Sequence, residues 1–381
     1  MTDVSIVPCA SYETNEVRKA LQQVLEPVGG LSWVTQGMRI AIKANLVSMM
    51  KPESAATTHP ALLCELVRML KEKGAEVVIG DSPGGLYNAA MVNRVYAATG
   101  MRQAEAAGAT LNDDYSIAEA TFPTAMVAHD FTYTAYLDRV DAIINFCKLK
   151  THGMMGMSAA VKNMFGVVPG TFKPEYHFRY PDHRDFANML IDLNSYFAPK
   201  LKLCIVDAVV GMEGNGPTQG RPRKLGALLA STCPHKLDLV CAALIGLGIQ
   251  DVPTLEAAAE NQLIPNSVEK LHISGDYKSL CVTDFDNIHM RRSLQFEGKG
   301  QFVAMFLRNS LRTEPRPDRK SCIGCKKCAE ICPAHVITMK NKLPVIDRNR
   351  CITCFCCQEF CPVGAMKVHR PLIARLLNHK K

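Results

Sequence analysis

The sequence lacks the features that mark membrane, secreted and nucleic-acid-binding proteins. Its longest nearly apolar run, LVCAALIGLGI at residues 239–249, is about half of the roughly 20 residues that a membrane-spanning helix needs. The first residues, MTDVSIVPCASYETNE, contain no basic segment followed by an apolar one, so we predict no secretory signal. Aromatic residues are sparse around the basic C-terminal segment, which disfavours nucleic-acid binding. These absences predict a cytoplasmic protein without a membrane span.

Common cofactor motifs are missing as well. The 11 histidines show no H-x-x-x-H or facial-triad spacing, so no histidine metal site is indicated. The sequence contains neither the dinucleotide fingerprint nor a Walker loop. It does contain 16 cysteines. A disulfide scaffold would require a short secreted chain, so these cysteines favour metal binding in a reducing compartment.

The chain of 381 residues is longer than one ordinary core requires, which predicts two domains. Apolar runs typical of strands alternate with helical patterns up to about residue 290. The strand-like runs are residues 4–10, 38–47, 75–81, 141–147 and 201–210, and the helical patterns are residues 13–25, 59–75 and 183–197. This alternation predicts an α/β domain with a mostly parallel or mixed sheet flanked by helices. Residues 120–136 alternate without a helical pattern and predict an antiparallel extension.

A second, smaller domain is predicted at the C-terminus. The segment LRTEPRPDRK combines two prolines with many charges, which predicts neither strand nor helix. We therefore predict an α/β domain over residues 1–310, a linker over 311–318, a small α+β domain over 319–371 and a basic tail over 372–381. Residues 308–381 contain 16 Lys and Arg against 5 Asp and Glu, whereas the remaining residues contain 28 against 31. This positive charge either attracts an acidic partner or offsets thiolates bound to metal.

The C-terminal segment repeats one cysteine pattern. Cys322, Cys325, Cys328 and Cys332 follow C-x2-C-x2-C-x3-C-P, and Cys351, Cys354, Cys357 and Cys361 repeat it. In two-cluster modules the fourth cysteine of each run binds the other cluster. This rule predicts two [4Fe–4S] clusters. One would be held by Cys322, Cys325, Cys328 and Cys361, and the other by Cys351, Cys354, Cys357 and Cys332.

Zinc ribbons and disulfides are the alternatives, but a zinc ribbon needs neither the third in-step cysteine nor the proline. Residues 319–369 resemble a bacterial two-cluster [4Fe–4S] ferredoxin module. Cys356 breaks the spacing and is interpreted as a small apolar residue beside a cluster, with an auxiliary ligand as the alternative.

Polar motifs follow several predicted strands, where open α/β sheets place ligands. Lys43 and Asn45 end one strand, Thr58 and His59 precede a helix with Pro60 in its first turn, and Asp81 and Ser82 lie in GDSPGG. GDSPGG either wraps an anion or forms a turn capped by Asp81. The loop GMEGNGPTQG adds Glu213 and Asn215. We interpret these residues as candidates for binding an anionic ligand.

The segment KLKTHGMMGMSAAVKNMFGVVPG, from Lys148, contains the densest group of side chains that could bind a ligand or react. Lys148, Lys150, His152, Lys162 and Asn163 are close in sequence, and neighbouring cations can hold a carboxylate or phosphate. Solvated lysines around a structural turn are the alternative. His152, Lys162 and Asp81 are the candidate catalytic residues, with His152 or Asp81 as proton donor.

Six motifs together resemble the family described as domain of unknown function 362. They are Lys43–Asn45, Thr57–Pro60, Gly80–Gly84, Lys148–His152, Lys162–Gly166 and Gly211–Gly216. The resemblance covers residues 3–290, and many members of this family carry a ferredoxin tail. Residues 152–170 are also loosely similar to a motif of nickel-pincer lactate racemases, and this short likeness implies no nickel site.

These observations predict a redox protein. Its clusters would take low-potential electrons from a ferredoxin or reductase and pass them to a small anionic ligand, or to a partner's cofactor, at the large domain. If the protein is an enzyme, it is a ferredoxin-type reductase. The alternatives are an electron relay whose large domain is a docking module and a reductive activator of another enzyme, with an acidic protein as acceptor.

Overall fold

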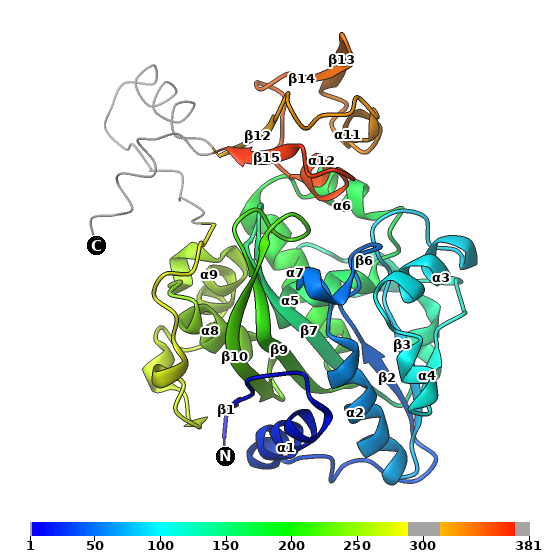
Figure 1. The fold of residues 1–381 in the computed structure, drawn as a ribbon, viewed down its shortest axis with the longest axis vertical. Coiled ribbons are helices and arrows are strands. Elements are labelled where there is room, and N and C mark those ends of the chain that lie inside the picture. Colours follow the sequence, from blue (N-terminus) through cyan, green and yellow to red (C-terminus); the bar gives the residue numbers. More distant parts are fainter. Residues whose placement is uncertain (1, 289–312, 370–381) are drawn as a thin grey trace.

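The computed structural model describes residues 2–288 and 313–369 as two units, an α/β unit and a smaller C-terminal unit (Figure 1). The predicted basic tail, residues 372–381, lies outside the described residues, as does the end of the predicted α/β domain. No described helix has the length and apolar character needed to cross a bilayer. The predicted domain boundaries stay a prediction.

One large mixed sheet forms the centre of the α/β unit. In the described residues its order is β11-β1-β10-β9-β7-β2-β3-β4, and β8 pairs with β7 off this path. The strands are β1 Val4–Pro8, β2 Arg39–Lys43, β3 Glu76–Gly80, β4 Thr110–Leu111, β7 Ala142–His152, β8 Gly156–Ser158, β9 Leu201–Glu213, β10 Arg221–Ser231 and β11 Ile273–Ser274. The strands β9, β7, β2, β3 and β4 run parallel to one another. The predicted α/β class is therefore confirmed.

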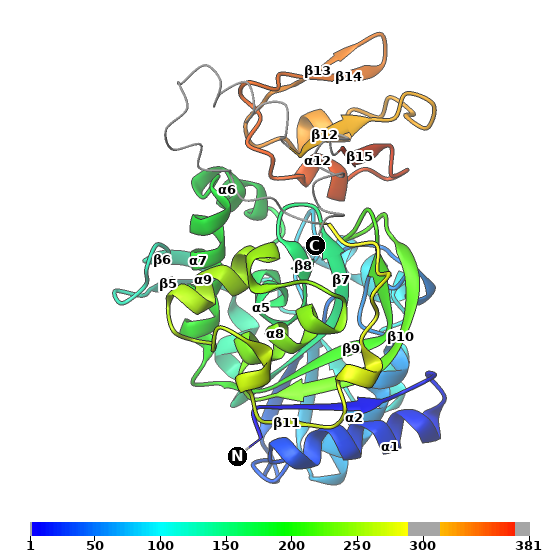
Figure 2. The ribbon, with the colours of Figure 1, turned by 90° about the vertical axis from the view of Figure 1, so that its left-hand side faces the viewer.

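Helices cover both faces of this sheet, which explains why its strands are apolar on both sides (Figures 1 and 2). One face packs against α1 Thr14–Leu25, α2 Pro60–Glu72, α3 Ala89–Ala98 and α4 Gln103–Ala106. The other packs against α5 Ala160–Asn163, α7 His183–Phe197, α8 Pro234–Leu244 and α9 Pro253–Glu260. The helix α6, Lys173–Arg179, lies toward the C-terminal unit (Figure 2). His59 caps α2 by accepting a hydrogen bond from the backbone N–H of Ala61, with Pro60 in the first turn as predicted.

Two parts of the α/β unit differ from the prediction, namely the antiparallel pair near residues 120–136 and the strand β10. Residues 120–136 contribute to an antiparallel pair, β5 Ile117–Thr121 with β6 Asp130–Thr134, but this pair is a separate two-stranded sheet. The strand β10 was not among the predicted strands. Its first four residues, RPRK, are largely exposed, and Gly226 interrupts its pairing with β9 at a positive φ of 68°. A polar start and an internal glycine hide the strand pattern.

The C-terminal unit contains two short antiparallel pairs and two one-turn helices. These elements are β12 Glu314–Pro317, α11 Lys327–Glu330, β13 Ile337–Lys340, β14 Leu343–Ile346, α12 Cys356–Glu359 and β15 Met366–His369. β12 pairs with β15, and β13 pairs with β14. The expectation that residues 311–318 form no strand is wrong for Glu314–Pro317. Prolines are tolerated here because β12 is an edge strand, where a missing N–H leaves no partner unsatisfied.

The C-terminal unit docks on the loop that joins β9 to β10. The Gln358 side chain is fully buried and donates hydrogen bonds to the backbone oxygens of Asn215 (2.9 Å) and Gly216 (3.3 Å). The Asn215 side chain accepts a hydrogen bond from the backbone N–H of Val368. Gly84 lies so close to the Phe360 ring that a Cβ atom at this position would be 2.7 Å from it. The two units are therefore in direct contact through polar and apolar groups.

Candidate functional site

The eight in-step cysteines line two separate hollows in the C-terminal unit. The first hollow, about 360 Å³ with its open mouth, is lined by Cys322, Cys325, Cys328 and Cys361. The second, about 310 Å³, is lined by Cys332, Cys351, Cys354 and Cys357. Each hollow thus takes three cysteines from one run and the fourth from the other run. The two sets of cysteines that the sequence predicted as cluster ligands thus line one hollow each, and their binding of two clusters stays a prediction.

The donor set of each hollow fits an iron–sulfur cubane. Four cysteine sulfurs are what a [4Fe–4S] cluster requires. No disulfide joins any of the 16 cysteines. Within the described ranges, no three His, Cys, Asp or Glu side chains converge closely enough to hold a single metal ion. The four cysteines that line each hollow match the number of thiolates that a cubane needs.

The two hollows differ in their access to solvent. In the first, Cys325 is exposed and its three companions are partly exposed, and the neighbouring Ile323 is 63% exposed. In the second, Cys332, Cys354 and Cys357 are all buried. Cys356 lines neither hollow and is itself buried. Its interpretation as a small buried residue beside a cluster is compatible with this position and stays a prediction.

In the α/β unit the structure joins Lys43 to Asp81 at the carboxyl edge of the sheet. Their Nζ and Oδ1 atoms are 2.7 Å apart, and both side chains are buried. Asn163 donates to the backbone oxygen of Lys43 (3.2 Å) and to Oδ1 of Asn145 (2.7 Å). A Cβ atom at Gly166 would overlap both Asp81 and Lys43, so only glycine allows this approach. Asp81 is thus a partner of Lys43 rather than a free proton donor.

The motif around Ser82 is closed by a second part of the chain. The hydroxyl of Ser82 accepts a hydrogen bond from the backbone N–H of Gly170 (2.7 Å). The backbone carbonyl of Ser82 accepts a hydrogen bond from Lys173 Nζ. The N–H of Ser82 donates to the oxygen of Gly166 (3.0 Å). GDSPGG therefore packs against residues 166–173 instead of wrapping an open loop around an anion.

Basic side chains from β7, α5 and α6 gather where the C-terminal unit docks. Five residues form what we call the basic cluster: Lys150, His152, Lys162, Lys173 and His177. Burial lowers the pKa of Lys150 to about 7 and that of Lys173 to about 7. The Lys162 ammonium lies 4.6 Å from the centre of the Phe165 ring, and burial lowers its pKa as well. The sequence predicted Lys148, Lys150, His152, Lys162 and Asn163 as one group. Of these, Lys148 pairs with Asp207 and Asn163 bonds to Lys43 and Asn145. The sequence missed Lys173 and His177.

The carboxylate of Glu359, at the end of α12, lies among these bases. Its Oε1 is 3.0 Å from Nε2 of His152. Nδ1 of His152 accepts hydrogen bonds from the N–H groups of Met154 (3.1 Å) and Met155 (3.3 Å), which assigns the ring proton to Nε2. Burial raises the pKa of Glu359, but the hydrogen bond from His152 and the positive charge of Lys162 outweigh it and lower that pKa to about 2.

Sequence reasoning missed Glu359, although one signal was present. It stands two residues before Cys361, so it lies inside the second cysteine run and close to a predicted cluster ligand. The equivalent residue of the first run, Glu330, is exposed. Only the fold reveals that Glu359 meets His152, which is 207 residues away in the chain.

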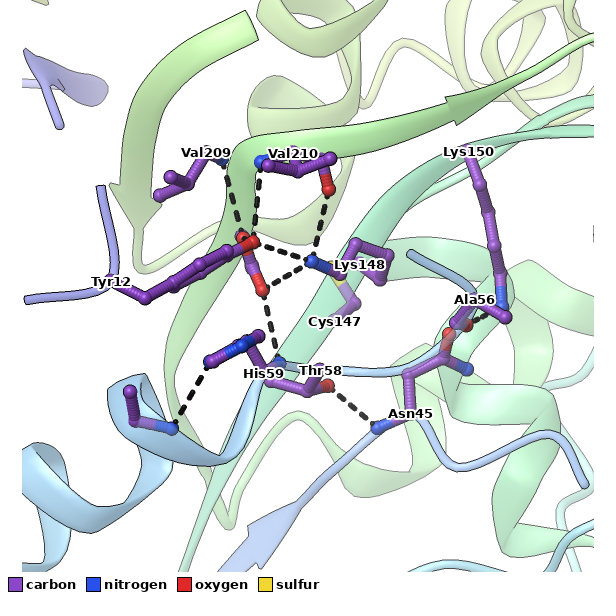
Figure 3. A network of polar contacts seen from close by, with 12 residues as sticks. Tyr12, Asn45, Ala56, Thr58, His59, Cys147, Lys148, Lys150, Val209 and Val210 are labelled. Carbon is purple, nitrogen blue, oxygen red and sulfur yellow. Dashed lines mark hydrogen bonds and ion pairs between the residues drawn. The ribbon is translucent and has the colours of Figure 1, made fainter. Parts of the chain in front are cut away.

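Four further residues of the predicted anion-binding set also contact other parts of the protein, namely Thr58, His59, Glu213 and Asn215. Tyr12, Lys148, Asp207 and the N–H of His59 form a closed buried network, in which Lys148 Nζ lies 2.5 Å from Asp207 Oδ2 (Figure 3). Thr58 accepts from the N–H of Asn45 and donates to the oxygen of Phe146. Glu213 pairs with Arg221, and Asn215 contacts the C-terminal unit. The buried Oδ1 of Asn45 has no hydrogen-bond partner among the described residues.

Lys150 permits a test by the pH dependence of stability. Its pKa is about 7 in the folded protein and about 10.4 in the unfolded chain, so between these values the unfolded chain binds the extra proton. The free energy of unfolding of the wild type should therefore rise relative to Lys150→Met as pH increases from 7 to 9. The expected slope is on the order of 1 kcal/mol per pH unit, measured by urea unfolding. A difference that stays constant with pH would contradict the buried position of Lys150.

The described residues thus define an iron–sulfur protein in which a ferredoxin-type unit docks on an α/β unit. The chain belongs to the family described as Domain of unknown function (DUF362), whose model matches residues 40–243. A model described as 4Fe-4S dicluster domain matches residues 321–365. Both predicted resemblances are therefore confirmed, as is the binding of an iron–sulfur cluster.

Known proteins similar to this chain include a thylakoid-associated protein of Synechocystis sp. It is 32% identical over 275 residues, which cover 70% of this chain and 81% of the relative. Two solved structures each share 12% sequence identity with this chain. A protein from Thermotoga maritima has a TM-score of 0.36 over 57% of this chain and 55% of its own. The lactate racemase apoprotein from Thermoanaerobacterium thermosaccharolyticum has a TM-score of 0.41 over 65% and 58%. The chain spans less than two thirds of either solved structure.

Proposed function

We propose that this protein transfers electrons through two [4Fe–4S] clusters to an acceptor at the α/β unit. The observation that carries the proposal is the double role of α12, where Cys357 faces the second hollow and Glu359 faces the basic cluster. The first hollow is the more exposed of the two and suits entry of electrons from a partner. The donor would be a ferredoxin or a reductase, and the acceptor a small anionic molecule or a cofactor of an acidic partner protein.

Each cluster supplies one-electron chemistry at low potential when bound. Side chains of the α/β unit would bind the acceptor and stabilise its charge. Lys150 and Lys162 favour an anion and stabilise negative charge that develops on an acceptor. His152 holds a proton on Nε2 and can donate it as a hydrogen bond to an acceptor, whereas Asp81 is paired with Lys43. His152 would act as a proton donor only in its doubly protonated form. Under this proposal the protein is a reductase of the ferredoxin type.

A non-catalytic relay, or a reductive activator of another enzyme, is the second candidate. It is favoured by the position of Glu359, since an internal carboxylate already contacts the basic cluster. In that case the basic cluster serves to dock the C-terminal unit. The predicted cytoplasmic location and the absence of nucleic-acid binding stay predictions under both candidates.

Anaerobic purification and reduction test the proposal. The protein should be brown and bind about eight irons, four for each cluster. A protein-sized donor such as reduced ferredoxin should reduce both clusters in the wild type. After the first cluster is removed by Cys325→Ser, this donor should reduce the second cluster at least tenfold more slowly, whereas dithionite should reduce it as before. Equal rates with ferredoxin would contradict entry at the first hollow, and bound zinc in place of iron would end the proposal.

A further inference from the structure

The basic cluster holds three lysine ammonium groups that lack a carboxylate partner among the described residues. Among the described residues, no carboxylate lies within ion-pair distance of Lys150, Lys162 or Lys173. Lys150 donates one hydrogen bond, to the oxygen of Ala56 (2.6 Å), and Lys173 donates one to the oxygen of Ser82. An ammonium group carries three donors. The cluster can therefore accept further negative charge.

Glu359 has the properties of a replaceable occupant. Its side chain remains 20% exposed although its carboxylate contacts the buried His152. Among the described residues of the α/β unit, the partner within 3.0 Å of its carboxylate is Nε2 of His152. The buried side chain of Gln358 also holds α12, through its hydrogen bonds to Asn215 and Gly216. Thr218 donates to the backbone oxygen of Glu359 (3.3 Å), and Gln219 donates to that of Cys361 (3.3 Å). None of these hydrogen bonds uses the carboxylate of Glu359.

We propose that the basic cluster is a binding site for a small carboxylate, and that Glu359 occupies this site until the ligand displaces it. The inference deepens the proposed anion site of the α/β unit. A carboxylate is the ligand class because the cluster already places the Nε2–H of His152 and an excess of ammonium charge around one such group. Displacement of Glu359 moves α12, which also carries Cys357 of the second hollow.

Acetate is a suitable probe because it matches the end of the glutamate side chain. Isothermal titration calorimetry should show that Glu359→Ala binds acetate with a Kd at least tenfold lower than the wild type, since the occupant is gone. Glu359→Gln should bind no more tightly than the wild type, because the amide still fills the site. Adding Lys162→Met to Glu359→Ala should weaken binding at least tenfold.

The chain provides a matched control at Glu330. This residue occupies the same position in the first cysteine run but is exposed, so Glu330→Ala should bind acetate as the wild type does. Chloride at equal ionic strength separates binding from screening. Tighter binding of inorganic phosphate than of acetate to Glu359→Ala would overturn the carboxylate class. Equal acetate affinities of Glu359→Ala and the wild type would overturn the site itself.

A measurement on the wild type avoids reliance on the folding of a variant. Hydrogen–deuterium exchange of residues 356–361 should speed up at least twofold in saturating acetate, because displaced Glu359 releases α12. Unchanged exchange would overturn the displacement. Iron content and visible absorbance, recorded on every sample, report on the clusters independently. A protein that binds acetate as expected but holds no iron would refute the proposed electron transfer and leave the carboxylate site intact.

Discussion

A Cys361→Ser variant should retain one of its two clusters and bind about four irons instead of about eight. The reason is that Cys361 lines the first hollow together with Cys322, Cys325 and Cys328, although it belongs to the second cysteine run. A cubane that loses one of four thiolates is expected to be lost or strongly destabilised. Iron analysis and electron paramagnetic resonance after reduction measure the outcome.

Double variants separate the crossed arrangement from a sequential one. If the hollows group the cysteines as the structure shows, Cys322→Ser added to Cys361→Ser should still leave about four irons, since both residues serve one cluster. Cys351→Ser added to Cys361→Ser should leave none, because each cluster loses a ligand. A sequential arrangement reverses these two results. Cys356→Ser is the matched control and should keep about eight irons.

Lys43→Met should destabilise the α/β unit by about 3–5 kcal/mol, because it leaves the carboxylate of Asp81 buried without its counter-charge. The Lys43 side chain is fully buried and that of Asp81 is 3% exposed, so water cannot replace the lost partner. The double variant Lys43→Met with Asp81→Asn should be less destabilised than the single one. Urea unfolding followed by the single tryptophan, Trp33, reports on this unit.

An exposed ion pair provides the control for this prediction. Arg102 and Glu105 are 3.3 Å apart, and their side chains are 51% and 44% exposed. Arg102→Ala should change the free energy of unfolding by about 0.5 kcal/mol or less. If Lys43→Met costs no more than Arg102→Ala, the Lys43–Asp81 pair does not exist as a buried contact in solution.

The sequence predicted those helices in which apolar residues recur at helical spacing, and those strands that form a continuous apolar run. α1, α2 and α7 were predicted from apolar spacing, and β7 and β9 from continuous apolar runs. It failed for β12, whose prolines imitate a linker, and for β10, whose charged first residues imitate a loop. In both strands, pairing with a partner strand outweighs local propensity.

The cysteine spacing alone determined which chemistry the C-terminal unit supports. Three cysteines in one tight loop share a site because the chain between them is too short to separate them. The prediction that each group takes its fourth cysteine from the other run came from the general behaviour of two-cluster modules, which the repeated spacing resembles. The spacing of the cysteines within one run is a local feature of the chain, so it can be recognised in the sequence.

Only the tertiary structure decided which charged groups meet at the basic cluster. Lys150 and His152 lie two residues apart on one strand and therefore on one face, but Lys173 and Glu359 come from α6 and α12. The same fold removed Thr58, His59 and Glu213 from consideration as free ligands by giving each a partner. The energy of a buried charge depends on what surrounds it in space, and that environment is assembled from segments far apart in the chain.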